Sequence, residues 1–226
     1  MARIVKAPDE RRSELIACAQ KLFYSKGYES TSVRDIVDEV GVAKGTFYYY
    51  FDSKQAILEA VVEELIAQSV ALMRAIIADQ TLDAIAKWKK TIQVINDWKI
   101  GLKADLIAVS RILRMDGNLR LRYQFQAKAT QLVTPELAQI VAQGCEEGVF
   151  HTEYAVEAAE CAIAVLYAFS NAVTDILLNP EEYEDPITLA RRRFEATQTA
   201  IERVLGAPSG SLPIVDKDTL AAWFAD

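Results

Sequence analysis

Residues 31–54 read TSVRDIVDEVGVAKGTFYYYFDSK, and this stretch decides the fold. Ser32, followed three residues later by Asp35, resembles a capping box, which starts a helix. Apolar residues then recur at three- and four-residue spacing from Val33 to Val40, as they do on one face of a helix. Gly41 follows directly, where a left-handed residue ends a helix at little cost. The pattern predicts a short helix that stops at this glycine.

A second short helix is predicted over residues 43–50. Phe47 and Phe51 are four residues apart and can share its buried face. Gly45 weakens a helix by roughly 1 kcal/mol relative to alanine, so a purely structural helix would gain nothing from it. The residues left for the outer face are Lys44, Thr46, Tyr48, Tyr49 and Tyr50. A helix-turn-helix places its second helix in the major groove. The pattern therefore indicates a sequence-specific DNA-binding protein, the alternative being a helical hairpin with tyrosines on its surface.

Residues 9–58 resemble the N-terminal domain of the TetR family of bacterial transcriptional regulators. The resemblance lies in a helix ending AQKLFYSKGYESTS and in the run VRDIVDEVGVAKGTFYYYFDSKQAIL, and it is nearly gapless. Beyond residue 60 it is architectural, with QGCEEGVF at 143–150 similar to a helix end late in the family's ligand domain. It implies an all-α fold. We expect a three-helix helix-turn-helix domain at 1–53, a helical effector-binding and dimerisation domain at 54–206, and a C-terminal tail at 207–226.

The resemblance also implies roles at matching positions. Lys44 and Gly45 stand where the family reads bases, and Thr46, Tyr48 and Lys54 match positions that hold phosphates. The other residues expected at DNA are Ser32, Arg34, Tyr49 and Tyr50. Among these, the tyrosine at position 50 stands where histidine is frequent in the family, which leaves its role open.

The net charge of −7 argues against a general affinity for nucleic acid. The charge is unevenly distributed, because residues 1–55 hold 9 Lys and Arg against 8 Asp and Glu, while the rest hold 16 against 24. A neutral-to-basic N-terminal part joined to an acidic remainder suits a protein that binds particular DNA sequences rather than all DNA. Asp52 would repel phosphate, so we expect it, with Ser53, to cap the next helix. The basic residues at the N-terminus are Arg3, Lys6, Arg11 and Arg12.

Other classes of site find little support in the sequence. The cysteines at 18, 145 and 161 have neither metal-ligand spacing nor a disulfide framework. Cys145 and Cys161 are either redox sensors or buried structural thiols. We expect no enzyme, because His151 is the single histidine and no phosphate-binding glycine loop is present. No apolar run reaches the roughly 20 residues of a membrane helix, so a cytoplasmic protein without a membrane partner is expected.

The rest of the chain is predicted to be helical, with glycine and proline as punctuation. Pro135 should kink or interrupt its helix. Residues 207–213 are expected to be a linker, followed by either a short packed helix or a disordered end. The expected helices cover residues 9–26, 54–78, 81–100, 103–115, 118–144, 154–178, 186–205 and 216–225.

The segment 154–178 is apolar on more than one face, so it should be buried on several sides. The family resemblance implies a homodimer built from helices 154–178 and 186–205; the alternative is a buried helix in a monomer. It also implies a small-molecule effector and no cofactor. The candidate effector contacts are Trp88, Trp98, Asp105, Met115, Tyr123, Phe125, Tyr167, Asn171 and Asp175. The two aspartates could meet a cationic ligand, the alternative being a helix cap or surface exposure. For the other seven the alternative is a core or interface position.

Together these features predict a ligand-responsive repressor that binds double-stranded DNA at a palindromic operator as a dimer. Two alternatives stay open. One is a helical small-molecule-binding or scaffold protein whose head no longer binds DNA. The other is a regulator that responds to oxidation through Cys145 or Cys161.

Overall fold

The computed structural model describes residues 8–215 and 217–225, which are helices joined by turns without a strand. The chain divides into two compact units. Unit 1 takes the described residues of Met1–Ala67 together with Ala108–Phe125, and unit 2 takes those of Gln68–Ile107 and Gln126–Asp226. The boundaries between the units fall within the helices α4 (Lys54–Ile77), α6 (Lys103–Leu113) and α7 (Leu119–Glu146). This division therefore differs from the functional domains expected from the sequence, whose boundaries stay a prediction.

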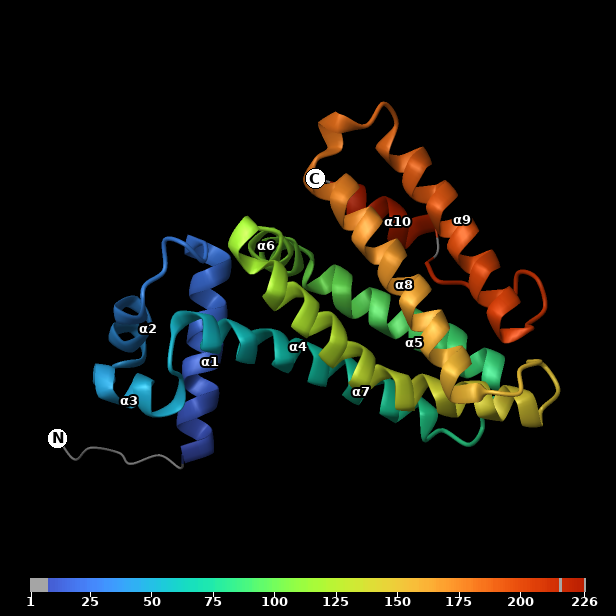
Figure 1. Cartoon of the computed structure of the whole chain (residues 1–226), viewed down its shortest axis with the longest axis horizontal. Coiled ribbons are helices and arrows are strands. Elements are labelled where there is room, and N and C mark those ends of the chain that lie inside the picture. The colour runs from blue at the N-terminus through green and yellow to red at the C-terminus, as the bar shows by residue number, and fades with distance from the viewer. Residues whose placement is uncertain (1–7, 216, 226) are drawn as a thin grey trace. The chain divides into compact units, whose positions relative to one another are not determined.

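Unit 1 is a small helical head (Figure 1). Its helices are α1 (Pro8–Lys26), α2 (Val33–Val40), α3 (Lys44–Tyr50), the first part of α4 (Lys54–Ile77), the end of α6 (Lys103–Leu113), the 3-10 turn η1 (Asp116–Asn118) and the start of α7 (Leu119–Glu146). The fully buried side chains at its centre include Leu15, Phe23, Ile36, Phe47 and Ile57. These come from α1, α2, α3 and α4, so one apolar core fixes the three short helices against the start of α4.

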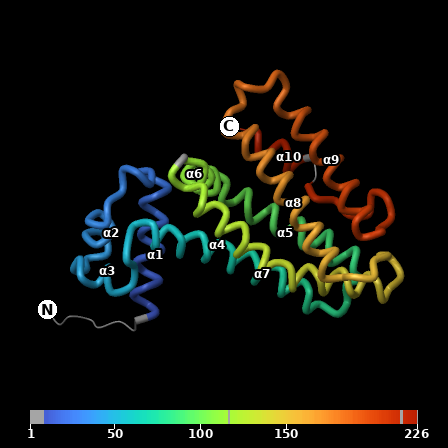
Figure 2. The backbone as a smooth tube through the Cα atoms, in the orientation of Figure 1, coloured from blue at the N-terminus to red at the C-terminus, as the bar shows by residue number. Residues whose placement is uncertain are grey.

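Unit 2 is a larger helical body. Besides the remaining parts of α4, α6 and α7, it contains α5 (Ala84–Gly101), α8 (Ala155–Leu178), the 3-10 turn η2 (Pro180–Glu182), α9 (Pro186–Leu205) and α10 (Lys217–Phe224). Helices α8 and α9 lie side by side and are joined by the short η2 turn (Figure 2). Trp88, Phe150, Ile140 and Ile201 are almost completely buried in its core.

Helix α7 runs through Pro135 without ending. The expected interruption is therefore wrong, while the other expected outcome, a kink at Pro135, stays a prediction. Proline removes one backbone donor and clashes with the preceding turn, at a cost of about 3 kcal/mol. Burial of Thr134, Leu137 and Ala138 on either side holds the helix in place.

The C-terminal segment packs onto unit 2. The Trp88 Nε1–H donates to the Pro213 carbonyl at 2.9 Å, and Glu202 Oε1 accepts from the Leu212 N–H at 3.1 Å. Leu212 and Leu220 are buried. For the described part of residues 216–225 the alternative of a disordered end is wrong, because Lys217–Phe224 form a helix and the Lys103 ammonium donates to the Ala222 carbonyl at 3.1 Å.

Helix α8 differs from the expectation that no segment is apolar enough for a membrane span. By length and composition alone it could cross a membrane. An 18-residue stretch of this helix has a mean hydropathy of 1.8, and 22% of that stretch is buried. The sequence-based search missed it because Glu157, Glu160 and Asp175 interrupt the apolar run.

Candidate nucleic-acid interface

A capping box starts α2, as the sequence predicts. The Ser32 hydroxyl accepts from the Asp35 N–H at 3.1 Å, and the Asp35 carboxylate accepts from the Ser32 N–H at 2.6 Å. Lys26 Nζ lies 2.9 Å from the same carboxylate. The lysine and then the Ser32 hydrogen bonds hold the pKa of Asp35 well below its usual range. The carboxylate is therefore charged and fixes the first turn of α2.

The turn between α2 and α3 depends on Gly41. Its φ of 74° and ψ of 38° lie in the left-handed region, which favours glycine. The Gly41 N–H donates to the Asp38 carbonyl at 3.3 Å, and the Val42 N–H donates to the Val37 carbonyl at 2.9 Å. These bonds close the end of α2 and set the direction in which α3 begins.

Helix α3 has a buried face and an exposed face. Phe47 is fully buried and Phe51, which follows the helix, is 4% exposed, with their ring centroids 5.7 Å apart. On the other side, Tyr48 is 47% exposed and Tyr49 is 77% exposed. Lys44, Gly45 and Thr46 occupy the first turn, the first two exposed and Thr46 partly so. A row of one cation, one glycine and hydroxyl groups can meet phosphates and base edges.

Tyr50 packs more deeply than its two neighbours. It is half-buried against the core of unit 1, and its ring meets that of Tyr49 edge to face at 4.8 Å. Packing explains why an aromatic residue stands here. A contact between Tyr50 and DNA stays a prediction.

Lys54 has an internal partner that the sequence did not reveal. Its Nζ donates to the Tyr28 carbonyl at 2.8 Å and lies 4.1 Å from the centroid of the Tyr28 ring. The Thr31 N–H donates to the same carbonyl at 3.1 Å. Lys54 thus ties the start of α4 to the connection between α1 and α2. An ammonium carries three donors, so it retains others for a phosphate.

The remaining head residues are placed as follows. Arg34 Nε is 3.4 Å from the Asp38 carboxylate, and with side-chain exposures of 86% and 67% this pair constrains the guanidinium little. Asp52 and Ser53 are both predicted to cap α4. Ser53 does so, because its hydroxyl accepts from the Ala56 N–H at 3.0 Å, and Asp52 is exposed. Arg11 pairs with Glu14, and Arg12 lies over the Phe51 ring. The expected basic residues Arg3 and Lys6 lie outside the described residues.

The candidate effector residues are divided between the units. Met115, Tyr123 and Phe125 belong to unit 1, and the other six belong to unit 2. Tyr123 is 75% exposed because Leu121 and Phe125 turn inward, and a residue midway between them on a helix faces the opposite side. Met115 is 39% exposed, and Asn171 is also exposed. These three side chains are exposed in the chain, and a role in effector binding stays a prediction for them.

Structural contacts are seen for three other candidates. Trp88 is 2% exposed, and its indole N–H is taken by the Pro213 carbonyl. Asp175 accepts a hydrogen bond from the Tyr183 hydroxyl at 2.6 Å, which braces the end of α8. Phe125 is buried in the core of unit 1.

Three candidates remain half-buried in unit 2: Trp98, Asp105 and Tyr167. Burial raises the pKa of the Asp105 carboxyl, and it raises the pKa of Tyr167 to about 12. Partial shielding from water disfavours the charged form of each group. A role in effector binding stays a prediction for all three.

The cysteines are free thiols. Cys18 is half-buried near the Ile36 carbonyl, and burial raises its pKa, as for an inert core thiol. The Cys145 thiol donates to the Thr152 carbonyl at 3.5 Å, and Cys161 is exposed on α8. Within the part of the chain that the structure covers, no group of three or more His, Cys, Asp or Glu residues could hold a metal.

Comparisons with known proteins agree with the geometry of the head. The family model for bacterial regulatory proteins of the TetR family matches residues 15–61. The regulator TtgR of Pseudomonas putida is 27% identical over 165 residues, covering 69% of this chain and 78% of that protein. The repressor KstR2 of Rhodococcus jostii is 35% identical over 68 residues, covering 30% of this chain. The chain spans only about a quarter to a third of the length of several such relatives.

The fold of the whole chain is similar to solved structures as well. A TetR-family regulatory protein from Rhodococcus RHA1 superposes with a TM-score of 0.52 at 22% identity, covering 88% of this chain and 99% of that one. At this identity the likeness concerns the fold. The capped helix-turn-helix, the sequence match over it and the shared all-helical fold agree with one another. Residues 15–61 therefore form a DNA-binding domain of the TetR family of bacterial transcriptional regulators, in a chain whose fold is similar to that of TetR-family proteins.

Proposed function

We propose that this chain is a cytoplasmic, ligand-responsive repressor that binds a palindromic operator as a homodimer. The observation that carries the proposal is the exposed face of α3, which presents Lys44, Gly45, Tyr48 and Tyr49 on a helix whose direction is fixed by Gly41. A recognition helix of this kind enters the major groove with its first residues at the base edges. We assign the chain no cofactor and no catalytic role.

The contacts divide into two kinds. Lys44 and Gly45, with Arg34 from α2, lie where base edges would be read. Residues proposed to hold phosphates are Ser32, Thr46, Tyr48, Tyr49, Tyr50 and Lys54. Phosphate contacts set the register of the protein on the duplex, whereas base contacts choose the sequence.

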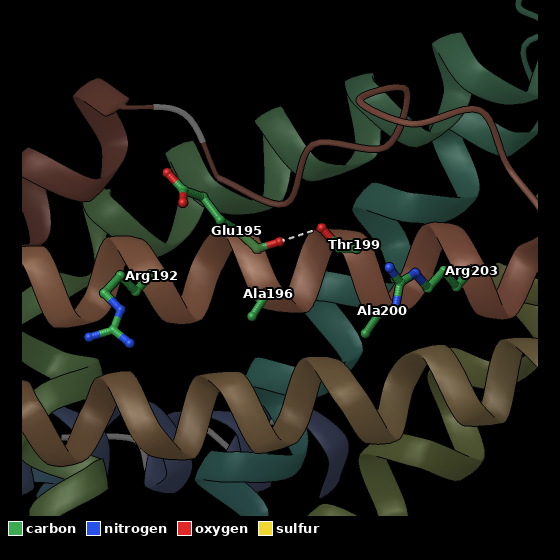
Figure 3. Close-up of a pocket in the computed structure, with 6 residues that line it drawn as sticks. All are labelled: Arg192, Glu195, Ala196, Thr199, Ala200 and Arg203. Carbon is green, nitrogen blue, oxygen red and sulfur yellow. Dashed lines mark hydrogen bonds between the residues drawn. The ribbon is translucent and has the colours of Figure 1, made fainter.

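A second copy of the chain is the proposed partner of α8 and α9. Val156 is 51% exposed and Ile187 is 45% exposed, next to the largely unburied apolar surface of α8. Helix α9 carries a shallow groove of about 520 Å³, lined by Arg192, Glu195, Ala196, Thr199, Ala200 and Arg203 (Figure 3). Small residues between the arginines let another helix approach closely. Exposed Glu157 and Glu160 on α8 offer opposite charge to those arginines.

Two-fold pairing would present two recognition helices to half-sites about 34–36 Å apart or a multiple of that spacing. A small molecule bound in the body would favour a dimer whose heads no longer match this spacing. Such an effector shifts the equilibrium only by its difference in affinity for the two arrangements. Repression is the function of the relative KstR2, and we extend it to this chain.

The test is a set of single variants titrated against operator DNA and random DNA at several salt concentrations. Tyr48→Ala should weaken binding to all sequences about equally. Lys54→Ala should do the same and reduce the salt dependence by about one unit of slope. Lys44→Ala should also relax the preference among bases. Operator binding that is unchanged by Tyr48→Ala would contradict the proposed orientation of α3.

The same titration separates two roles of Lys54. A loss of affinity with an unchanged salt slope would mean that Lys54 acts only through its bond to Tyr28. Lack of any salt-sensitive DNA binding by the wild-type chain would favour a helical ligand-binding protein instead.

A further inference from the structure

Residues 8–67 hold seven cationic side chains, and the partners of these side chains divide them into two groups. Four of them are paired with carboxylates from α1 and α2. The pairs are Arg11–Glu14 at 2.6 Å, Lys21–Glu39 at 2.8 Å, Lys26–Asp35 at 2.9 Å and Arg34–Asp38 at 3.4 Å. A carboxylate cancels much of the positive field of its partner and itself repels a phosphate. Paired cations are therefore poor sites for the DNA backbone.

The other three cations lie over aromatic rings. Measured from the cationic atom to the ring centroid, these contacts are Arg12 over Phe51 at 5.3 Å, Lys44 over Tyr48 at 5.7 Å and Lys54 over Tyr28 at 4.1 Å. Within the described part of the chain, no ion pair involves any of these three cations. An aromatic ring attracts a cation through its quadrupole without neutralising it. Each of the three therefore keeps its positive charge for a partner outside the chain.

The cations that lie over rings are gathered at the recognition helix α3. Lys44 begins α3, and Lys54 begins α4 just after it. Arg12 comes from α1, but its guanidinium lies over Phe51, the residue that directly follows α3. The paired cations, by contrast, all come from α1 and α2. The positive charge that is not neutralised by the chain thus lies on or next to the helix proposed to meet DNA.

Arg12 is well suited to hold a phosphate. Its side chain is exposed, whereas the ring beneath it is 4% exposed, so the guanidinium packs on a fixed surface. A phenyl ring has no lone pair to accept an N–H, and a guanidinium has five N–H donors in a planar fork that matches a phosphate. Asp52 follows Phe51 in the chain and is exposed, yet it forms no ion pair with Arg12. The donors of Arg12 are therefore not spent on a carboxylate of this chain.

We propose that Arg12 binds a phosphate of the DNA backbone, as a third cation beside Lys44 and Lys54. The inference rests on the proposed function, because it adds a contact to the same interface. Arg11, the preceding residue of the same helix, is engaged by Glu14 and is not such a contact. A phosphate contact releases counterions from DNA, so it shows in the salt dependence of binding, whereas packing of Arg12 on Phe51 alone does not.

The test compares Arg12→Met with the adjacent Arg11→Met in titrations at several salt concentrations. The probe is duplex DNA of random sequence, because phosphates are present in every sequence. Arg12→Met should reduce the slope of log affinity against log salt by about 0.9 for each copy of the chain bound. That slope corresponds to a loss of about eightfold at about 0.1 M salt, which vanishes toward about 1 M.

Arg11→Met is the matched control, since it changes the net charge by the same amount and should leave the slope nearly unchanged. Arg12→Lys keeps the charge, so it should keep most of the slope. Circular dichroism and the Tm establish that each variant is folded, as expected for substitutions at an exposed position.

Equal changes of slope in Arg11→Met and Arg12→Met would overturn the proposal, because they would show a general effect of net charge. Weaker binding by Arg12→Met with an unchanged slope would also overturn it, since this is the result of losing only the contact with Phe51. A wild-type chain without salt-sensitive binding to the random duplex would contradict the proposed function itself. That result is recognised before any variant is compared.

Discussion

Replacing Gly45 with alanine separates the stability of α3 from its contact with DNA. Gly45 is exposed in the first turn of α3, and an added Cβ would have no atom outside its own helix backbone within 4 Å. The substitution therefore has no steric cost in the free protein. Alanine is favoured over glycine in a helix by roughly 0.5–1 kcal/mol. Gly45→Ala should raise the Tm by about 2 °C for a chain of this length.

DNA binding should change in the opposite direction. If α3 lies in the major groove, the added methyl group lies where the backbone meets the base edges. Losing one good base contact costs about 1–3 kcal/mol, so we expect operator affinity to fall by about tenfold or more. Thermal unfolding followed by circular dichroism gives the first quantity, and fluorescence anisotropy with labelled operator gives the second.

Gly101→Ala is the matched control. Gly101 is also helical and exposed, with free space around an added Cβ, but it ends α5 in unit 2. It should stabilise the chain by a similar amount and leave operator affinity unchanged. If Gly45→Ala raises the Tm and leaves DNA binding intact, α3 does not approach DNA through its first turn, and the reasoning is refuted.

Three further substitutions test other parts of the structure. Ser32→Ala removes the cap of α2 and should lower the free energy of unfolding by about 1 kcal/mol in urea titrations; no loss would show that the capping box is dispensable. Gly144→Ala would place a Cβ 2.6 Å from Cε2 of buried Phe150. It should therefore lower the free energy of unfolding by about 1–3 kcal/mol. Adding Phe150→Leu to the same chain should recover part of that loss. Because the pKa of Tyr167 is raised to about 12, the folded chain keeps a proton that the unfolded chain loses above pH 10, so stability falls between pH 10 and 12. Tyr167→Phe should make that decline shallower in alkaline urea titrations, and an unchanged slope would contradict the burial of this phenol.

Much of the head could be predicted from the sequence because its signals are local. The capping box at Ser32 and the left-handed Gly41 involve residues a few positions apart, and both are confirmed. Helix ends in the body also lie close to the predicted ones. The interruption expected at Pro135 is absent because a local rule was applied to a helix whose flanks are held by tertiary packing.

Contacts between distant residues were out of reach. The bond from Trp88 to the Pro213 carbonyl joins α5 to the C-terminal segment and gives a candidate ligand contact a structural partner. The bond from Lys54 to the Tyr28 carbonyl likewise depends on where the loop after α1 lies. Backbone acceptors carry no sequence signature, since every residue has one. Periodicity could have predicted the exposure of Tyr123, because its neighbours at 121 and 125 are apolar.

The most direct test of the central claim is selection from random duplex DNA, followed by titration of the selected sequence at two salt concentrations with random DNA as competitor. The account predicts enrichment of a palindrome with half-sites one helical turn, or a multiple of it, apart. Binding should resist the competitor and weaken steeply with salt. No enrichment, with equal affinity for selected and random duplexes, would contradict sequence-specific recognition by α3.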